Sequence, residues 1–215
     1  GNISQSIIKV TGALDNSSGM LTATDKIENI GSITTAADKI VATNGIINDN
    51  SLTLTSGNLS TQISGTGTTN IAGAVTNNSI ISQDVNVSSS GKLTVGANIG
   101  NLINSGEVTS NTSNLTGAIN NSGILNLSGT LNKEISGLGS TKIVGDSFTL
   151  LDGAAVKGVL DINNQTLNVL ATKTENLFND VNINSGTLNL INNGINNTTS
   201  SNNELKDLLN NLLDS

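Results

Sequence analysis

The sequence contains no cysteine, histidine, proline, tryptophan or tyrosine, and only two phenylalanines among its 215 residues. Without cysteine the chain can form neither disulfide bridges nor thiolate metal sites. Without histidine it lacks the usual general base of a nucleophilic triad. Aromatic side chains supply much of the buried area of a compact core, so their scarcity argues against a conventional globular interior.

Charged side chains are also few, with nine cations, sixteen anions and a formal net charge of −7. The cations are all lysines and are scattered singly, whereas nucleic-acid binding requires clusters that neutralise phosphates. The same scatter argues against a basic membrane-surface helix, and no apolar run approaches the ~20 residues of a spanning helix. We therefore expect no nucleic-acid partner and no direct membrane insertion by this segment. The chain opens at Gly1 without a signal-peptide pattern, which predicts a mature or excised fragment.

The residues that are abundant point to a repetitive core. Asparagine makes up about one residue in six, glycine accounts for 23 residues, and serine and threonine are frequent. Even so, 35% of the residues are hydrophobic, which is too many for a disordered polar tail. The hydrophobic residues are almost all isoleucine, leucine, valine and alanine, the side chains that stack in identical layers.

One short stretch of sequence occurs twice in nearly the same form. Residues 63–73 read ISGTGTTNIAG, and residues 135–145 read ISGLGSTKIVG. The matching positions are the glycines and the isoleucines, whereas a shared composition alone would scatter the matches. The alignment extends without a gap from residues 46–73 to residues 118–145. The repeat therefore indicates one turn geometry that is used again further along the same stack.

A looser unit recurs along the whole chain, with a polar corner followed by a short alternation of apolar and polar residues. Examples are SLTLTSGNLS at residues 51–60 and GILNLSGTLN at residues 123–132. A period of two predicts β-strands, and asparagine and glycine suit corners because both tolerate φ > 0. The absence of proline fits strands that are paired on both sides, because proline cannot donate to a ladder.

We therefore predict an all-β fold, a single-stranded parallel β-helix or β-solenoid, over residues 1–200. Each of about ten coils would contain roughly 18–24 residues and would place Ile, Val and Leu inward, one strand spacing above the previous coil. The last segment differs, because Leu205, Leu208, Leu209, Leu212 and Leu213 follow a helical period. Residues 201–215 are thus predicted to be a short amphipathic helix that covers the end of the solenoid, or that contacts another subunit or a following domain.

The sequence indicates no catalytic, cofactor-binding or metal-binding residue, and no motif in it identifies a binding residue. The densest acidic trio in the strand region is Asp146, Asp152 and Asp161, which we interpret as solvated surface because neither histidine nor arginine supports it. Sugar sites also use aromatic platforms, and Phe148 and Phe178 are the only aromatic residues. Thr-x-Thr pairs could form an ice-binding array, but the separations of Thr22/Thr24, Thr53/Thr55 and Thr66/Thr68 are unequal.

The repeated I-x-G-x-G-x-x-x-I-x-G turns, with SGILNLSGTLN at residues 122–132 and SGTLNLI at residues 185–191, resemble the passenger domains of bacterial autotransporters. The likeness is greatest to the Asn/Ile/Thr-rich surface antigens of organisms such as rickettsiae, and it covers most of residues 11–192. The resemblance implies a right-handed parallel β-helix, export through the outer membrane and display on the cell surface, often for adhesion. Because the family has no universal functional motif, the resemblance implies no site residues.

Three functions are compatible with the sequence. The first is an extracellular bacterial surface protein that acts as a rigid stalk and a binding surface for a receptor on host or neighbouring cells. The second is a structural protein that self-associates into a surface layer or filament. We expect the protein not to be an enzyme, and the third function, a carbohydrate-active enzyme, would need carboxylates such as Asp152 or Asp161 for its chemistry.

Overall fold

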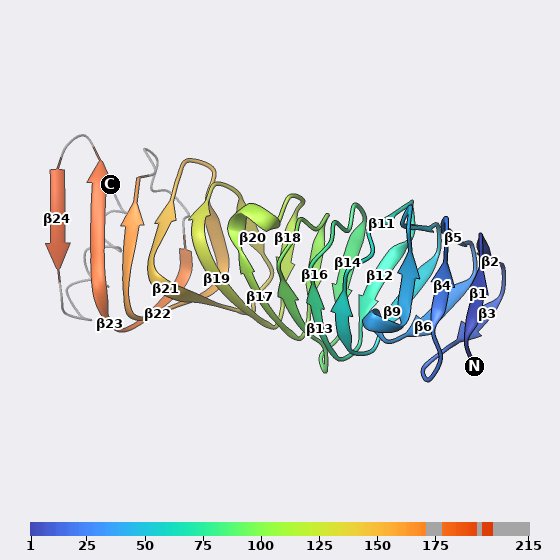
Figure 1. The fold of residues 1–215 in the computed structure, drawn as a ribbon. Coiled ribbons are helices and arrows are strands. Elements are labelled where there is room, and N and C mark those ends of the chain that lie inside the picture. The colour runs from blue at the N-terminus through green and yellow to red at the C-terminus, as the bar shows by residue number, and fades with distance from the viewer. Residues whose placement is uncertain (171–177, 193–194, 200–215) are drawn as a thin grey trace. The chain divides into compact units, whose positions relative to one another are not determined.

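The structure is a computed structural model that describes residues 1–170, 178–192 and 195–199 (Figure 1). These residues form an all-β parallel solenoid of about nine turns with almost no helix, which confirms the predicted fold class. The predicted helix at residues 201–215 lies outside the described residues. The chain divides into two compact units, residues 1–110 with 114–117 (unit 1) and residues 111–113 with 118–215 (unit 2).

In unit 1 each coil contributes three short strand positions. The first positions are β1 (Ile3–Gln5), β4 (Leu21–Ala23), β7 (Ile40–Ala42), β10 (Gly57–Leu59), β13 (Ala74–Asn77), β15 (Lys92–Val95) and β17 (Glu107–Asn111). The second positions are β2 (Ile8–Val10), β5 (Ile27–Asn29), β8 (Ile46–Asn48) and β11 (Ile63–Ser64), followed by single bridges at Ile81, Ile99 and Leu115. The third positions are β3 (Ala13–Asp15), β6 (Ser32–Thr35), β9 (Ser51–Leu54), β12 (Thr68–Ile71), β14 (Asp84–Val87) and β16 (Leu102–Asn104). The 3-10 turn η1 (Ala37–Lys39) interrupts the strands of unit 1, and a second 3-10 turn, η2 (Thr112–Asn114), contains residues of both units.

Inward side chains of unit 1 stack in columns, one residue per coil. The column at the second position contains residues of nearly one type, each no more than 5% exposed: Ile8, Ile27, Ile46, Ile63, Ile81, Ile99 and Leu115. Burying an aliphatic side chain of this size is worth about 1.5–3 kcal/mol. The repeated columns therefore replace the aromatic core that the composition does not supply.

Coil length varies more than a strict repeat would allow. Strand pairing joins Ile8 to Ile27 in one coil, but it joins Ile99 to Leu115 by a shorter step. In unit 2 the step lengthens again, from Val156 to Phe178. The shortest coil of the described residues therefore contains fewer residues than the roughly 18–24 that the sequence predicts. The corners differ in length to accommodate this.

The strands of unit 2 are longer than those of unit 1, because neighbouring strand positions merge around the corners. Its elements are β18 (Ile119–Asn121), β19 (Ile124–Leu131), β20 (Glu134–Ser136), β21 (Ser140–Leu150), β22 (Ala155–Val169), β23 (Phe178–Asn192) and β24 (Ile195–Thr199). Pairing is parallel from β18 to β23, and β24 then pairs antiparallel with β23.

The repeated sequence forms the same turn in each unit. Gly65 and Gly137 have φ values of 109° and 86°, in the left-handed region that favours glycine. A Cβ atom at Gly65 would overlap the carbonyl of Asn48, and one at Gly137 would overlap the carbonyl of Asn121. The predicted reuse of one turn geometry is thus present in both units. Glycine is required at both positions for two reasons: φ is positive, and a Cβ atom would have no space.

The columns predict a large difference between inward and outward substitutions. Leu52→Ala removes a fully buried side chain from β9 and should destabilise the protein by about 2–5 kcal/mol, because the neighbouring coils cannot collapse into the gap. Thr53→Ala, on the outward side of the same strand, is the matched control and should change stability by less than about 0.5 kcal/mol. Urea unfolding of the three proteins measures both effects, and equal losses would contradict the stacked arrangement.

Candidate functional site

Asparagines at the corners of the coils are buried and engaged in hydrogen bonds. Asn29, Asn48, Asn77, Asn104 and Asn121, which we call the corner asparagines, are each at most 1% exposed. The side-chain oxygens of Asn29, Asn77 and Asn104 accept hydrogen bonds from the backbone N–H two residues later. This local bond is an Asx-turn, which closes the corner within its own coil.

The amide nitrogens of the corner asparagines reach the next coil. Asn29, Asn48 and Asn121 donate to the carbonyls of Ser51, Thr68 and Ser140, at 2.8, 3.1 and 3.0 Å. Each acceptor is the first residue of a strand in the following coil. A corner asparagine thus fixes where the next coil begins its strand.

Two corner asparagines also contact each other in a small buried network. Asn29 donates to the Asn48 side chain at 2.6 Å. The Gln83 amide, which is 6% exposed, lies within hydrogen-bonding distance of the Asn48 amide and the Thr69 hydroxyl. The group is satisfied by protein atoms, so it is a structural network inside unit 1.

Tolerance of positive φ, the property expected to place asparagine at corners, is the wrong explanation for the corner asparagines. Among the described residues, Asn164 is the single non-glycine residue with positive φ, at 66°. The corner asparagines have ordinary backbone conformations and are used for their amide groups. Sequence reasoning identified the correct place for asparagine but missed its burial, because a polar residue at a corner is usually assigned to the surface.

The outward side of the third strands carries a regular set of small polar side chains. Residues in register on β6, β9, β12 and β14 form two columns, which we call the polar face: Ser32, Ser51, Thr68 and Asp84 in one, and Thr34, Thr53, Asn70 and Asn86 in the other. Strand geometry spaces them about 4.8 Å between coils and roughly 6.6 Å along each strand. Asn70 donates to the Ser51 hydroxyl at 3.1 Å, and Asn86 donates to the Asn70 side chain at 3.4 Å.

Hydroxyl and amide groups at fixed spacing can donate and accept hydrogen bonds toward a second surface, and the single charge of the polar face is Asp84. The sequence-based Thr-x-Thr pairs did not identify this face. Thr22 lies in register with Val41, whereas Thr53 lies between Thr34 and Asn70. A second outward column in unit 1 contains Asn58, Thr76, Thr94 and Thr109. Unequal coil lengths hide both columns in the sequence.

The acidic trio is spread around the coils of unit 2. Asp146 is exposed in the middle of β21, Asp152 is exposed in the turn after that strand, and Asp161 is half-buried in β22. The Asp161 carboxylate accepts a hydrogen bond from the Ser140 hydroxyl at 2.6 Å and lies in register with Lys142. Within the described residues, no group of three or more acidic, histidine or cysteine side chains could hold a metal ion.

Phe148 belongs to the core of unit 2 and does not form a platform for a sugar. Its side chain is fully buried, and it lies in register between Gly129 and Leu167. The other aromatic residue, Phe178, begins β23, and its side chain lies outside the described part of the structure.

Ion pairs in the described residues lie on the surface. Lys26 and Glu28 pair at 2.8 Å, Lys92 and Glu107 at 3.0 Å, and Lys157 and Glu134 at 3.9 Å. The hydrogen bond between Lys26 and Glu28, with their mutual attraction, raises the pKa of Lys26 and lowers the pKa of Glu28. Both groups therefore stay charged at neutral pH, and the pair adds no reactive group to the surface.

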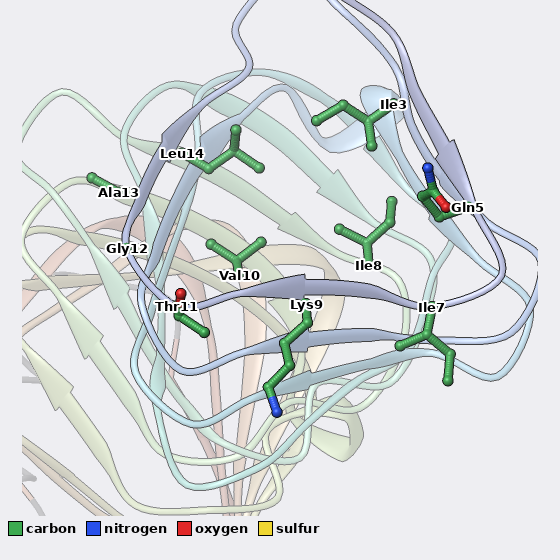
Figure 2. Close-up of a pocket in the computed structure, with 10 residues that line it drawn as sticks. All are labelled: Ile3, Gln5, Ile7, Ile8, Lys9, Val10, Thr11, Gly12, Ala13 and Leu14. Carbon is green, nitrogen blue, oxygen red and sulfur yellow. The ribbon is translucent and has the colours of Figure 1, made fainter.

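A hollow lies at the N-terminal end of unit 1, inside the first coil (Figure 2). Its volume is about 390 Å³. Figure 2 shows Ile3, Ile8, Val10 and Leu14 facing the inside of the coil, while Lys9 points away from it. The lining is mostly apolar, with Gln5, Lys9 and Thr11 at its polar parts, and Ile8 and Leu14 belong to columns whose next members are fully buried.

Comparisons of the chain with protein families, with curated proteins and with solved structures find no match in any of the three. Among the helices of the described residues, none has the length and apolar character that crossing a membrane requires. With no similar protein to indicate a binding surface, the choice depends on geometry alone. The polar face is the candidate site.

The corner asparagines generate a prediction about stability. Asn48→Ala removes one of the two acceptors of the buried Asn29 amide and the side-chain donor to the Thr68 carbonyl, and it should cost about 1–3 kcal/mol. Asn58→Ala, at an exposed position of β10, should cost less than about 0.5 kcal/mol. Denaturant unfolding compares the two variants, and a loss at Asn48 no larger than that at Asn58 would show that the network does not fix the coils.

Proposed function

We propose that the protein is a bacterial surface protein of the β-helical passenger type, displayed outside the outer membrane. Its coil stack would act as a rigid support, and its outer faces would bind a receptor on host or neighbouring cells. The observation that carries the proposal is the polar face, with its in-register columns of serine, threonine and asparagine. A support of this kind needs regular outer surfaces more than it needs a cleft.

The composition supports the same function. The chain has no cysteine to be oxidised outside the cell and a net charge of −7, which favours solubility. The polar face carries neither an aromatic residue nor a cation, so we propose recognition by many hydrogen bonds to a polar surface. We also propose a right-handed path for the coils, because crossovers between parallel strands are right-handed in about 98% of cases.

A second candidate function is self-association into a surface layer or filament. The observation in its favour is the first coil, whose strands β1, β2 and β3 pair with β4, β5 and β6 and present their other edges. Unpaired edges are templates for further strands. Sedimentation over a range of concentrations separates the candidates, since ordered polymers favour this second function and a persistent monomer favours the first.

Surface display predicts accessibility on intact cells. Trypsin added to intact bacteria that make the protein should remove it from immunoblots, because its lysines would face the medium. A cytosolic marker protein should survive the same treatment and controls for lysis. Complete protection of the protein in intact cells, with digestion after lysis, would contradict display on the cell surface.

The polar face predicts a local effect on binding. The double variant Thr34→Glu/Thr53→Lys places an ion pair in register on β6 and β9, leaves the net charge at −7 and should reduce attachment to receptor-bearing cells at least about tenfold. Thr76→Glu/Thr94→Lys makes the same change on β13 and β15 and should leave attachment within about twofold. Equal losses in both variants, with unfolding midpoints unchanged, would show that the polar face is not the binding surface.

A further inference from the structure

Glycines in this solenoid mark places where the preceding coil approaches closely. Among the described residues, eleven glycines outside the left-handed region have an atom of the coil before them within 3 Å of the position that a Cβ would occupy: Gly19, Gly31, Gly67, Gly73, Gly91, Gly96, Gly100, Gly106, Gly117, Gly139 and Gly158. For most of them the nearest atom is a backbone carbonyl oxygen. Real Cβ atoms do not approach backbone so closely, so glycine is required at these positions for space.

The need for glycine is clearest in one column, at the corner before the third strand, which contains Gly12, Gly31, Asn50 and Gly67. A Cβ at Gly31 would overlap the carbonyl of Gly12, and one at Gly67 would overlap the carbonyl of Asn50. The backbone bonds run through the same corner, from Ser32 to the Gly12 carbonyl at 2.9 Å and from Thr68 to the Asn50 carbonyl at 2.7 Å. Where the column contains Asn50 instead of glycine, the corresponding bond from Ser51 to Gly31 lengthens to 3.3 Å.

Gly12 occupies this column in the first coil, and neither reason for glycine applies to it there. Among the described residues, no heavy atom other than its chain neighbours lies within 4 Å of a Cβ built at Gly12. Its backbone is also outside the left-handed region. The requirement that explains Gly31 and Gly67 is a carbonyl arriving from the coil before, and the N-terminal side of Gly12 has space for one.

The rest of the first coil has the same incomplete character. Leu14 is half-buried, although Ile33 and Leu52, which follow it in its column, are fully buried. The hollow of about 390 Å³ inside this coil is lined mostly by apolar residues, and Ile3, Ile8, Val10 and Leu14 face into it (Figure 2). The charged residues of strands β1, β2 and β3 are Lys9 and Asp15, so little charge blunts the edges of these strands.

We infer that the N-terminal end of unit 1 is a joint for another coil. The occupant is a parallel β-coil of the same polypeptide ahead of Gly1, with aliphatic residues over Ile8 and Leu14 and a backbone carbonyl against Gly12. The direction follows from Gly31 and Gly67, which each receive the carbonyl of the coil that precedes them in the chain. This inference does not depend on the proposed function.

The test adds such a coil and then asks whether Gly12 becomes necessary. A copy of residues 19–37 is placed directly before Gly1, so that Leu21 of the copy precedes Ile3 by the same step that separates Leu21 from its partner Ile40. Gly12→Ala is made in the extended protein and in the 215-residue protein, and Gly31→Ala is made in both as the matched control. Urea unfolding and trypsin resistance of the added coil are measured.

In the 215-residue protein, Gly12→Ala should leave the folded-to-unfolded ratio unchanged or raise it up to about fivefold, because alanine restricts the unfolded chain. In the extended protein the same substitution should lower that ratio at least about fivefold, as overpacking does elsewhere. Gly31→Ala should lower it in both proteins. The added coil should resist trypsin at its lysine.

Three outcomes would overturn the inference. A neutral Gly12→Ala in the extended protein would show that no carbonyl arrives there. An added coil that trypsin removes as fast as an unfolded peptide would show that the end is not a joint. Dimerisation of the 215-residue protein in sedimentation, abolished by Gly12→Ala, would identify a second copy as the occupant in place of a preceding coil.

Discussion

The corner asparagines determine how each coil meets the next. Columns of aliphatic side chains drive the chain together, but hydrophobic contact has no direction, and one isoleucine can slide past another at little cost. A buried amide with two partners cannot slide, since a lost partner leaves a buried polar group unsatisfied at about 1–3 kcal/mol. Asn29 and Asn48 bond both to each other and to the strand starts at Ser51 and Thr68, so they convert nonspecific stacking into a defined register.

Two features of the fold could be read from the sequence because they follow from local rules. Period two and the lack of proline predicted paired strands, and the repeated residues 63–73 and 135–145 predicted a repeated turn. Both are present, and the turn depends on the left-handed glycines Gly65 and Gly137. The burial of Asn48 could not be predicted, because it depends on which atoms of the neighbouring coil lie at the corner, and coils of unequal length leave that register unspecified in the sequence.

The candidate site was hidden for a related reason. The polar face exists because Thr34, Thr53 and Asn70 fall in register, although the step from Thr34 to Thr53 is longer than the step from Thr53 to Asn70. The inward isoleucines follow the same unequal steps but can be recognised because they repeat in residue type, whereas the outward residues share only polarity. The acidic trio shows the opposite failure, because Asp146, Asp152 and Asp161 are close in sequence and lie at different places around the coils.

The hydrogen bonds of the corner asparagines extend over only one or two coils of the stack. Asn29 and Asn48 donate to the coil that follows, at Ser51 and Thr68, and only the contact between Asn48 and Gln83 extends a coil further within this network. Cohesion in such a chain is a sum of neighbour-to-neighbour terms, as in other solenoids. We therefore expect unfolding to begin at a terminal coil and to advance one coil at a time, while the interior coils stay folded. The loss of one coil then affects mainly its neighbours, which is an advantage for a protein with no disulfide to hold it together.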